Sequence, residues 1–368
     1  MDVKRVAVLG AGNGGITAAA DLKLRGFEVT LFDLPQFSRN IDLLKERGEL
    51  LLKEADQTSR VKLDVLTTDI EEALAGADVV LLTIPATWVE SFAEICAPII
   101  SEEQIIIFHG AACVAPLRFV KKAREMGIGT DFKIGELSTL AYGTRAFPER
   151  GEIELSLRVK EFYFSAYPGG RTDELIGVCR QLYDTAKPID NIWGTTLTNG
   201  NPEVHPGSCI VNAGRIDYSQ GEFWLYVEGI TKHTMNVVIE VGRERLALGS
   251  ALGYELEDGE KARFKRGYLM EGPEEMYVKY NTSPVFSKIK GPMSLESRYV
   301  TEDIANGLVL YSSLGKALGV PTPTTDAVIT LGGVLLQRDF MKEGVTLEKL
   351  GLEGMSREGL IEAVSLTE

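Results

Sequence analysis

Histidine is the side chain best suited to move protons near neutral pH, and the 368-residue chain has only three: His109, His205 and His233. His205 belongs to a polar segment with several prolines, Thr198-Asn199-Gly200-Asn201-Pro202-Glu203-Val204-His205-Pro206. We expect a rigid loop there, which presents the imidazole and the amide of Asn201 to a substrate cleft. Such a histidine can act as a general acid and base, and a purely structural role fits these residues equally well.

Asp303 is the carboxylate that we consider as a partner for that imidazole. It follows Thr301, a candidate N-cap, so we expect it in the first turn of a helix, where an acid stabilises the helix dipole by about 0.3–1 kcal/mol. In a catalytic interpretation it orients His205 and holds the ring proton. The two residues lie 98 positions apart, and this spacing does not show that they touch.

The other two histidines are weaker candidates. His109 ends an expected strand at the edge where cofactors bind, where it either lines the cleft or hydrogen-bonds locally. His233 stands at the start of a long helical stretch, where we expect it to be solvated.

A scaffold for this chemistry is predicted by the first 33 residues. An apolar strand leads into Gly10-Ala11-Gly12-Asn13-Gly14-Gly15, and a small-residue helix and a second strand ending at Asp33 follow. In a Rossmann unit the first glycine makes the tight turn, the second admits a pyrophosphate and the last lets helix and strand pack closely. We therefore predict dinucleotide contacts from Gly10, Gly12, Asn13, Gly14 and Gly15, rather than a glycine-rich loop of an unrelated α/β domain.

Asp33 indicates which dinucleotide is bound. An acid at this position hydrogen-bonds the adenosine ribose hydroxyls of NAD. A 2′-phosphate at ~4 Å would meet a like charge at a cost of about 4 kcal/mol at an effective dielectric near 20. We expect NAD, while Arg39 leaves NADP open.

Two residues are expected on the nicotinamide side of the cofactor. Pro85 and Ala86 follow the apolar run 79–84, at the carboxyl edge where open α/β sheets bind their ligands. The alternative is a strand that proline simply ends.

The composition excludes several classes of function. A net charge of −14 argues against nucleic-acid binding, because phosphate contacts require a basic surface. Four widely spaced cysteines without a CxxC pair fit reduced thiols and no metal site. No apolar stretch approaches the ~20 residues that span a bilayer, and no leader precedes the first strand, so we expect a cytoplasmic protein.

Two domains are expected from the change in pattern along the chain. Up to about residue 190 strand and helix signals alternate: strands at 62–66, 79–84, 104–108, 132–136, 152–159 and 161–166, the last two as a hairpin or edge pair, and helices at 116–126 and 173–185. From residue 191 strand signals almost vanish. Apolar stripes at helical spacing follow, one ended by Gly253 and another by Gly319. We therefore predict an α/β fold with a Rossmann domain at 1–190 and an all-helical domain at 191–368.

Motifs spread over nearly the whole chain make it resemble the opine dehydrogenases of the octopine and nopaline type. The matching pieces, in order, are GAGNGG at 10–15, Thr83–Ala86, Gly135-Glu136, AYGTR at 141–145, LTNGN at 197–201, His205-Pro206, NAGR at 212–215, YVEGIT at 226–231, Gly291-Pro292, Arg298-Tyr299, Glu302-Asp303, VPTP at 320–323 and LEKLGL at 347–352. Many relatives carry a histidine where this chain has Val89, so contacts of that side chain cannot be carried over.

The resemblance implies an activity and roles for the residues above. In that family a histidine serves as acid and base, and it is paired with an aspartate of the helical domain. The residues at the matching positions of this sequence are His205 and Asp303, and Asn201 lies close by in the sequence. The reaction implied joins an amino acid or other amine to a 2-oxo acid, and NADH reduces the resulting imine. The resemblance also implies small-molecule substrates and a homodimer.

A product with two carboxylates requires cations in an otherwise acidic protein. Arg145, Arg298 and Arg215 are the candidates, because a guanidinium binds a carboxylate through two hydrogen bonds. The alternative for each is an ordinary ion pair.

Two other functions remain open on the sequence. A 2-hydroxy-acid or ketone oxidoreductase would use the same scaffold without an amine. A nucleotide-responsive binding protein would bind the cofactor without turnover, which the intact acid and base pair disfavours.

Overall fold

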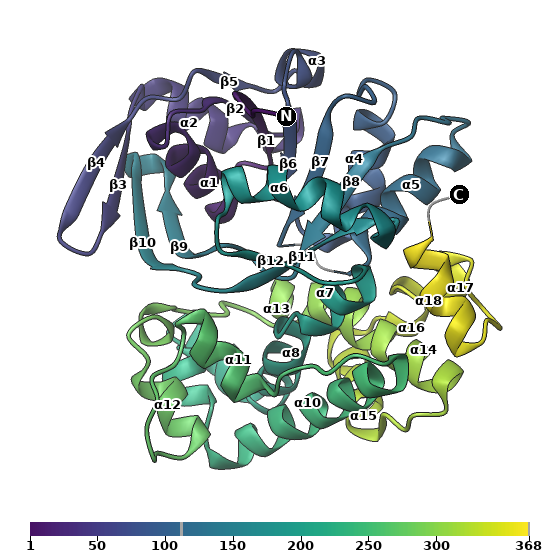
Figure 1. The fold of residues 1–368 in the computed structure, drawn as a ribbon. Coiled ribbons are helices and arrows are strands. Elements are labelled where there is room, and N and C mark those ends of the chain that lie inside the picture. Colours follow the sequence, from purple (N-terminus) through teal and green to yellow (C-terminus); the bar gives the residue numbers. More distant parts are fainter. Residues whose placement is uncertain (111–112, 367–368) are drawn as a thin grey trace. The chain divides into compact units, whose positions relative to one another are not determined.

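The computed structural model describes residues 1–110 and 113–366, which form two compact units (Figure 1). One unit extends from Met1 to Thr195 and includes the end of the chain from Val364 onward. The other extends from Thr196 to Ala363. The sequence pattern places the boundary at residue 190 and does not predict that the end of the chain returns to the first unit.

An eight-stranded sheet forms the centre of the first unit, with the order β12-β11-β8-β7-β6-β1-β2-β5. All four residues of its central strand β6 are buried, as expected for a parallel strand covered on both faces. Strand β11 is antiparallel to β8, and the other pairs are parallel. The strands are β1 (Arg5–Leu9), β2 (Glu28–Phe32), β5 (Val65–Thr67), β6 (Val79–Leu82), β7 (Ile105–His109), β8 (Lys133–Leu137), β11 (Phe162–Tyr167) and β12 (Ala186–Pro188).

A second sheet, which the sequence analysis did not predict, has the order β4-β3-β10-β9. Its strands are β3 (Leu50–Glu54), β4 (Gln57–Val61), β9 (Tyr142–Phe147) and β10 (Glu152–Arg158). The predicted pairing of 152–159 with 161–166 is wrong, because β10 pairs with β9 and β3, while β11 belongs to the large sheet. The strand predicted at 62–66 is found only in its last two residues, which begin β5.

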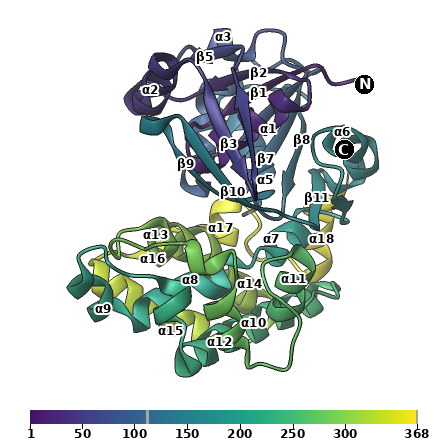
Figure 2. The same cartoon turned by 90° about the vertical axis from the view of Figure 1, so that its left-hand side faces the viewer.

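Helix α1 packs between the two sheets of the first unit, since it contacts β1 and β2 on one side and β9, β10, β3 and β4 on the other (Figure 2). This helix starts directly after the glycine turn. The helices of this unit are α1 (Asn13–Leu24), α2 (Arg39–Arg47), α3 (Ile70–Leu74), α4 (Val89–Cys96), α5 (Ala115–Glu125) and α6 (Thr172–Leu182), and α7 (Ile192–Thr198) crosses into the second unit.

The second unit is helical, as predicted. In its longest helix Met235, Val238, Val241, Leu248 and Leu252 are buried on one stripe, and Gly253 ends it in the left-handed conformation. No described helix is long and apolar enough to cross a bilayer. The helices are α8 (Asn201–Val211), α9 (Ala213–Ser219), α10 (Lys232–Leu252), α11 (Gly259–Arg266), α12 (Met276–Thr282), α13 (Arg298–Glu302), α14 (Val309–Leu318), α15 (Pro323–Leu336), α16 (Phe340–Glu343), α17 (Leu347–Leu350) and α18 (Arg357–Ser365), with π-helical segments at Leu225–Gly229 and Asp303–Leu308.

Candidate active site

The glycine turn of the first unit has room only for glycine at two of its positions. Gly10 has a φ of 104°, and a Cβ there would lie 2.4 Å from the carbonyl oxygen of Thr83. A Cβ on Gly15 would lie 1.7 Å from the carbonyl oxygen of Gly10. At Gly12 a Cβ would meet nothing within 4 Å, so open space adjoins the start of α1. No described side chain caps this helix, whose first N–H groups therefore remain available to an anion such as a pyrophosphate.

Asp33 fixes the conformation of the turn from the neighbouring strand end. Its Oδ2 accepts a hydrogen bond from the N–H of Ala11 at 2.8 Å, and its Oδ1 accepts from the N–H of Leu34 at 2.8 Å. Asn40 donates to the carbonyl oxygen of Ala11 at 2.8 Å. Burial raises the pKa of Asp33, although both backbone donors oppose this. The carboxylate thus lies at the end of β2, against the glycine turn, and Arg39 lies exposed at the start of α2.

Asn13 and Thr17 attach the second sheet to this turn. The Oδ1 of Asn13 accepts a hydrogen bond from the N–H of Ala146 at 2.9 Å, and the hydroxyls of Thr17 and Thr144 lie 2.8 Å apart. Ala146 and Thr144 both belong to β9. The four-stranded sheet therefore borders the predicted phosphate site, which no local sequence pattern indicated.

Pro85 and Ala86 lie where the sequence predicts them, just past the carboxyl end of β6. Pro85 is exposed, whereas Ala86 is buried and its carbonyl oxygen accepts a hydrogen bond from Arg118 at 2.8 Å. Val89 is fully buried at the start of α4.

In the helical unit His205 and Asp303 are in direct contact. The Nδ1 of His205 lies 2.7 Å from the Oδ2 of Asp303, and both side chains are buried. They meet because α8, which carries the histidine, packs against the segment Asp303–Leu308. Asn201 is half-buried four residues before His205, on the same face of the helix.

The local structure around both residues differs from the prediction. His205 lies in helix α8 and not in a loop: Pro202 occupies the first turn, where a missing N–H costs nothing, and Pro206 is tolerated inside the helix. Asp303 is not in a first turn capped by Thr301. The N-cap of α13 is Ser297, and the chain continues past Glu302 as a π-helical segment that begins at Asp303. Such segments are frequent at functional sites.

Two tyrosines that the sequence analysis assigned no role complete the surroundings of His205. The hydroxyl of Tyr226 lies 2.8 Å from Nε2, and the ring of Tyr299 stacks on the imidazole with centroids 3.9 Å apart and planes inclined by 8°. Tyr226 in turn stacks on Phe286 at 4.4 Å. Both tyrosines belong to motifs that carry the resemblance to the opine dehydrogenases, 226–231 and 298–299. Their place in these motifs is the sequence feature that could have indicated a role for them.

The protonation states follow from burial and from these partners. Burial lowers the pKa of His205; Asp303 opposes the shift and the charge of Arg298 adds to it. Burial also raises the pKa of Tyr226 well above its ordinary value, so its hydroxyl keeps the proton. A carboxylate accepts hydrogen bonds, so we assign the ring proton of neutral His205 to Nδ1, facing Asp303. Nε2 is then the acceptor of the Tyr226 hydroxyl.

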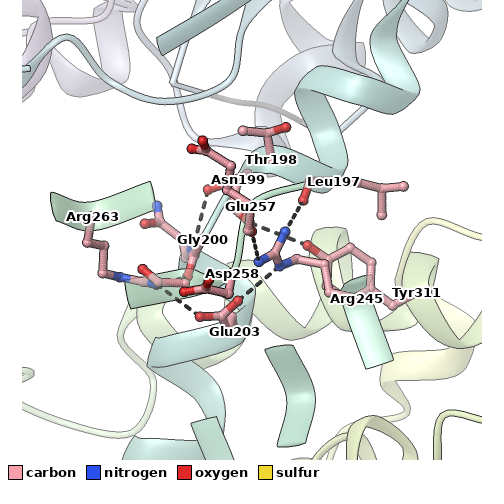
Figure 3. A network of polar contacts seen from close by, with 12 residues as sticks. Leu197, Thr198, Asn199, Gly200, Glu203, Arg245, Glu257, Asp258, Arg263 and Tyr311 are labelled. Atoms are coloured by element: carbon pink, nitrogen blue, oxygen red, sulfur yellow. Dashed lines mark hydrogen bonds and ion pairs between the residues drawn. The ribbon is translucent and has the colours of Figure 1, made fainter. Parts of the chain in front are cut away.

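A buried ion cluster holds the segment 197–200 that leads into α8 (Figure 3). Glu203 lies between two arginines, with Oε2 2.9 Å from Arg245 Nε and Oε1 3.0 Å from Arg263 Nη1. Burial alone would raise the pKa of Glu203, but the charges of the two arginines hold this pKa below its ordinary value. Each of the four carbonyl oxygens of the segment accepts a hydrogen bond from a side chain. Arg245 donates to Leu197 and Arg263 to Gly200. Arg266 donates to Thr198 and Tyr311 to Asn199.

The three candidate arginines have different surroundings. Arg298 follows Ser297 at the start of α13, with its side chain 57% exposed and its Nη1 3.6 Å from Oε2 of Glu302. Its guanidinium lies 5.7 Å from the centre of the Tyr299 ring. It is thus near His205. Arg215 on α9 is bound to Glu228 at 3.0 Å and to the carbonyl oxygen of Glu222. Arg145 is exposed on β9 of the first unit.

The two other histidines hold different positions. His109 is buried in the first unit, where its Nε2 accepts a hydrogen bond from the N–H of Ala141 at 2.9 Å and burial lowers its pKa to about 3. It is thus a local hydrogen-bond acceptor. His233 is exposed in the first turn of α10. Within the described residues no three His, Cys, Asp or Glu side chains are grouped so as to bind a metal.

Comparisons with known proteins agree with both units. Residues 188–336 match the family described as NAD/NADP octopine/nopaline dehydrogenase, alpha-helical domain. Residues 5–112 match the family described as NAD-dependent glycerol-3-phosphate dehydrogenase N-terminus. The opine dehydrogenase of Arthrobacter sp. (strain 1C) is 34% identical over 365 residues, which cover 99% of each chain.

Solved structures resemble the whole chain. An octopine dehydrogenase in complex with NADH and agmatine superimposes with a TM-score of 0.75 at 19% identity and covers 99% of both chains. A yersinopine dehydrogenase with bound NADP+ gives a TM-score of 0.71 at 16% identity and covers 98% of both chains. At this identity the similarity concerns the fold.

Proposed function

Because the chain belongs to the opine dehydrogenase family, as an NAD(P)-dependent oxidoreductase that acts on CH–NH groups, we propose that it joins an amine to a 2-oxo acid and reduces the imine. The observation that carries this proposal is the buried pair His205–Asp303, whose atoms lie 2.7 Å apart beside a half-exposed arginine. The substrates are thus a 2-oxo acid with an amino acid or other amine. NADH supplies the hydride that reduces the imine carbon.

His205 and Asp303 provide the proton transfers of this reaction. His205 is the source of the proton with which the substrate oxygen leaves as water when the imine forms, and it takes a proton back in the reverse direction. Asp303 fixes the ring tautomer and stabilises the imidazolium while it exists. Asn201, on the same face of α8, is positioned to hydrogen-bond the reacting groups.

The first unit binds the cofactor in this proposal. Gly10, Gly12, Asn13, Gly14 and Gly15 surround the pyrophosphate, Asp33 binds the adenosine ribose, and Pro85 and Ala86 lie along the nicotinamide. The open space at Gly12 and the uncapped start of α1 support the assignment. We place the cofactor domain at 1–190 and the substrate domain at 191–368.

Asp33 selects NAD over NADP. We expect the protein to bind NADH more tightly than NADPH, because a 2′-phosphate would face the Asp33 carboxylate. Asp33→Asn keeps the shape and removes the charge, so the preference should become smaller. Fluorescence titration with both cofactors measures it, with Asp42→Asn on the exposed face of α2 as the control. Tighter binding of NADPH by the unmodified protein would show that the assignment is wrong.

Arg298 binds the carboxylate of the oxo acid in this proposal. Arg298→Ala should raise the KM for the oxo acid about 10- to 100-fold, the value of hydrogen bonds between charged groups. Arg243→Ala, at another exposed guanidinium on α10, is the control. Steady-state kinetics give the result, and an unchanged KM would exclude the role. Arg145 and Arg215 are secondary candidates; Glu228 already binds the Arg215 guanidinium.

The decisive experiment follows NADH absorbance while the protein is mixed with pyruvate, oxaloacetate or 2-oxoglutarate, each with and without a panel of amino acids and simple amines. Oxidation only when both partners are present supports imine reduction. Oxidation by the oxo acid alone would instead indicate a 2-hydroxy-acid dehydrogenase. Cofactor binding without oxidation for any pair would indicate a binding protein.

The protein is a cytoplasmic homodimer in this proposal. Its four cysteines are buried, and none of them forms a disulfide within the described residues, in keeping with a reducing compartment. Leu331, Val334 and Leu335 form an exposed apolar stripe on α15, with Val334 70% exposed, and the same stripe on a second copy would cover it across a two-fold axis. Sedimentation gives the mass. Val334→Glu should reduce it to that of the monomer, and a monomeric unmodified protein would exclude the dimer.

A further inference from the structure

Each ring nitrogen of His205 already has a partner within the helical unit. Nδ1 lies 2.7 Å from Asp303, and Nε2 lies 2.8 Å from the hydroxyl of Tyr226. One ring face is covered by Tyr299 at 3.9 Å. A substrate therefore finds no open nitrogen on the imidazole, and the group through which a proton can leave Nε2 is the Tyr226 hydroxyl.

Tyr226 is held firmly in this place. Its ring stacks on Phe286 at 4.4 Å and 10°, and Tyr280 extends the same aromatic group. Its backbone carbonyl oxygen accepts a hydrogen bond from Asn281 at 2.7 Å. Rotating the phenol away from Nε2 would break the stacking of its ring, and the backbone bond keeps the whole residue in place, so we do not expect substrate to displace this tyrosine.

The chemistry of the phenol fits a proton carrier. Burial raises its pKa, so it does not lose its proton permanently at neutral pH. A hydroxyl can accept one hydrogen bond while it donates another. The exposed Arg298 adjoins the half-buried Tyr299, which stacks on His205 and shares a hydrogen bond with Tyr226. We therefore place the anionic substrate on this side of the Tyr226–His205 pair.

We infer that Tyr226 is the residue that exchanges protons with the substrate, as the outer member of a relay Tyr226–His205–Asp303. The inference rests on the proposed function and adds a catalytic residue to it. The amine arrives as an ammonium ion, and its proton passes through Tyr226 to Nε2, which makes the imidazolium. When the imine forms, Nε2–H passes its proton to the Tyr226 oxygen, while the Tyr226 hydroxyl proton moves to the departing hydroxyl of the substrate. The C–O bond breaks, water leaves and the nitrogen lone pair forms C=N, which gives the protonated imine.

The relay returns to its starting state in the reverse direction. Water that attacks the imine gives a proton to the Tyr226 oxygen, and the original hydroxyl proton of Tyr226 moves to Nε2. In both directions one proton passes between substrate and His205, and Tyr226 ends as a neutral phenol.

The chain offers a matched control in the same aromatic group. The hydroxyl of Tyr280 is buried and has no hydrogen-bond partner among the described residues. Tyr226→Phe and Tyr280→Phe therefore remove the same atom from neighbouring stacked rings, and only the first removes a bond to His205. Tyr226→Phe should lower kcat about 10²-fold with the KM for NADH unchanged, and Tyr280→Phe should stay close to the unmodified protein.

Two further measurements separate a relay from a packing role. Fluorotyrosines at position 226 change the acidity of the phenol with little change in its size, so kcat should follow that acidity in a relay and stay constant in a packing role. The ¹⁵N resonance of His205 Nε2, one of only three histidines, should move downfield in Tyr226→Phe and stay in place in Tyr280→Phe.

Unchanged or higher kcat in Tyr226→Phe would overturn the inference, because the Tyr226 hydroxyl would then have no effect on turnover or would slow it. Unchanged kcat across the fluorotyrosines, or an unmoved Nε2 resonance, would do the same. The resonance is measured without substrate. If none of the tested pairs of amine and oxo acid leads to NADH oxidation by the unmodified protein, the proposed function fails. The Nε2 resonance still decides in that case whether Tyr226 forms a hydrogen bond with His205.

Discussion

Replacing His205 with alanine should lower the turnover number of amine-dependent NADH oxidation by at least 10²-fold. The imidazole is the group whose protonation state changes in the proposed reaction, and it is the group that Asp303 contacts, at 2.7 Å. NADH binding should stay intact, because the glycine turn to which we assign the cofactor belongs to the other unit.

Stopped-flow absorbance gives the turnover number and fluorescence titration gives the Kd for NADH. His233→Ala removes an exposed imidazole from the start of α10 and should leave both values unchanged. His205→Gln keeps a polar side chain in the buried site and guards against a loss of activity through misfolding. Turnover near that of the unmodified protein in either His205 variant would remove this residue from the mechanism.

The largest effect on stability is expected for Glu203→Gln. The substitution removes the negative charge between Arg245 and Arg263 and leaves two buried guanidinium groups without a counter-charge. Breaking a buried ion pair in this way costs about 3–5 kcal/mol of the free energy of unfolding. The segment 197–200 should loosen as well, because the same two arginines bind its carbonyl oxygens.

Urea unfolding at pH 7 measures this loss. Glu240→Gln is the matched control, because Glu240 forms an exposed ion pair with Arg243 on α10, and such pairs contribute about 1 kcal/mol or less. The depressed pKa of Glu203 also gives a pH dependence: its contribution to stability is full above the unfolded pKa near ~4.3 and is lost as pH falls through the lower folded pKa. Equal losses in the two variants would contradict the account.

The Rossmann unit was predictable because its determinants are local. The glycine spacing, the buried run in β6 and the acid at the end of β2 lie within short stretches of sequence. The second sheet was not predictable in the same way, since β3 pairs with β10 and the pairing leaves no trace in the periodicity of either strand.

The pair His205–Asp303 shows the same limit. Pro206 indicates a loop by its own preferences, yet residues 202–210 are buried on all sides of α8, and this packing outweighs one missing hydrogen bond. The contacts of His205 with Tyr226 and Tyr299 join segments 21 and 94 residues apart in the chain. The sequence analysis predicted His205 and Asp303 as a pair. The contacts of His205 with Tyr226 and Tyr299 became clear only from the fold.

The pairing of β3 with β10 has a consequence for the nascent chain. Glu152 leaves the ribosome 101 residues after its partner Leu51, a delay of roughly 5–20 s at the usual 5–20 residues per second. During that time β4 covers one edge of β3, and the other edge offers unpaired backbone to any passing strand. Lys53 and Glu54 occupy the end of this edge, and charges there discourage intermolecular pairing. We therefore expect Lys53, which lies 2.8 Å from Glu152 in the folded protein, to discourage aggregation of the nascent chain before Glu152 is made.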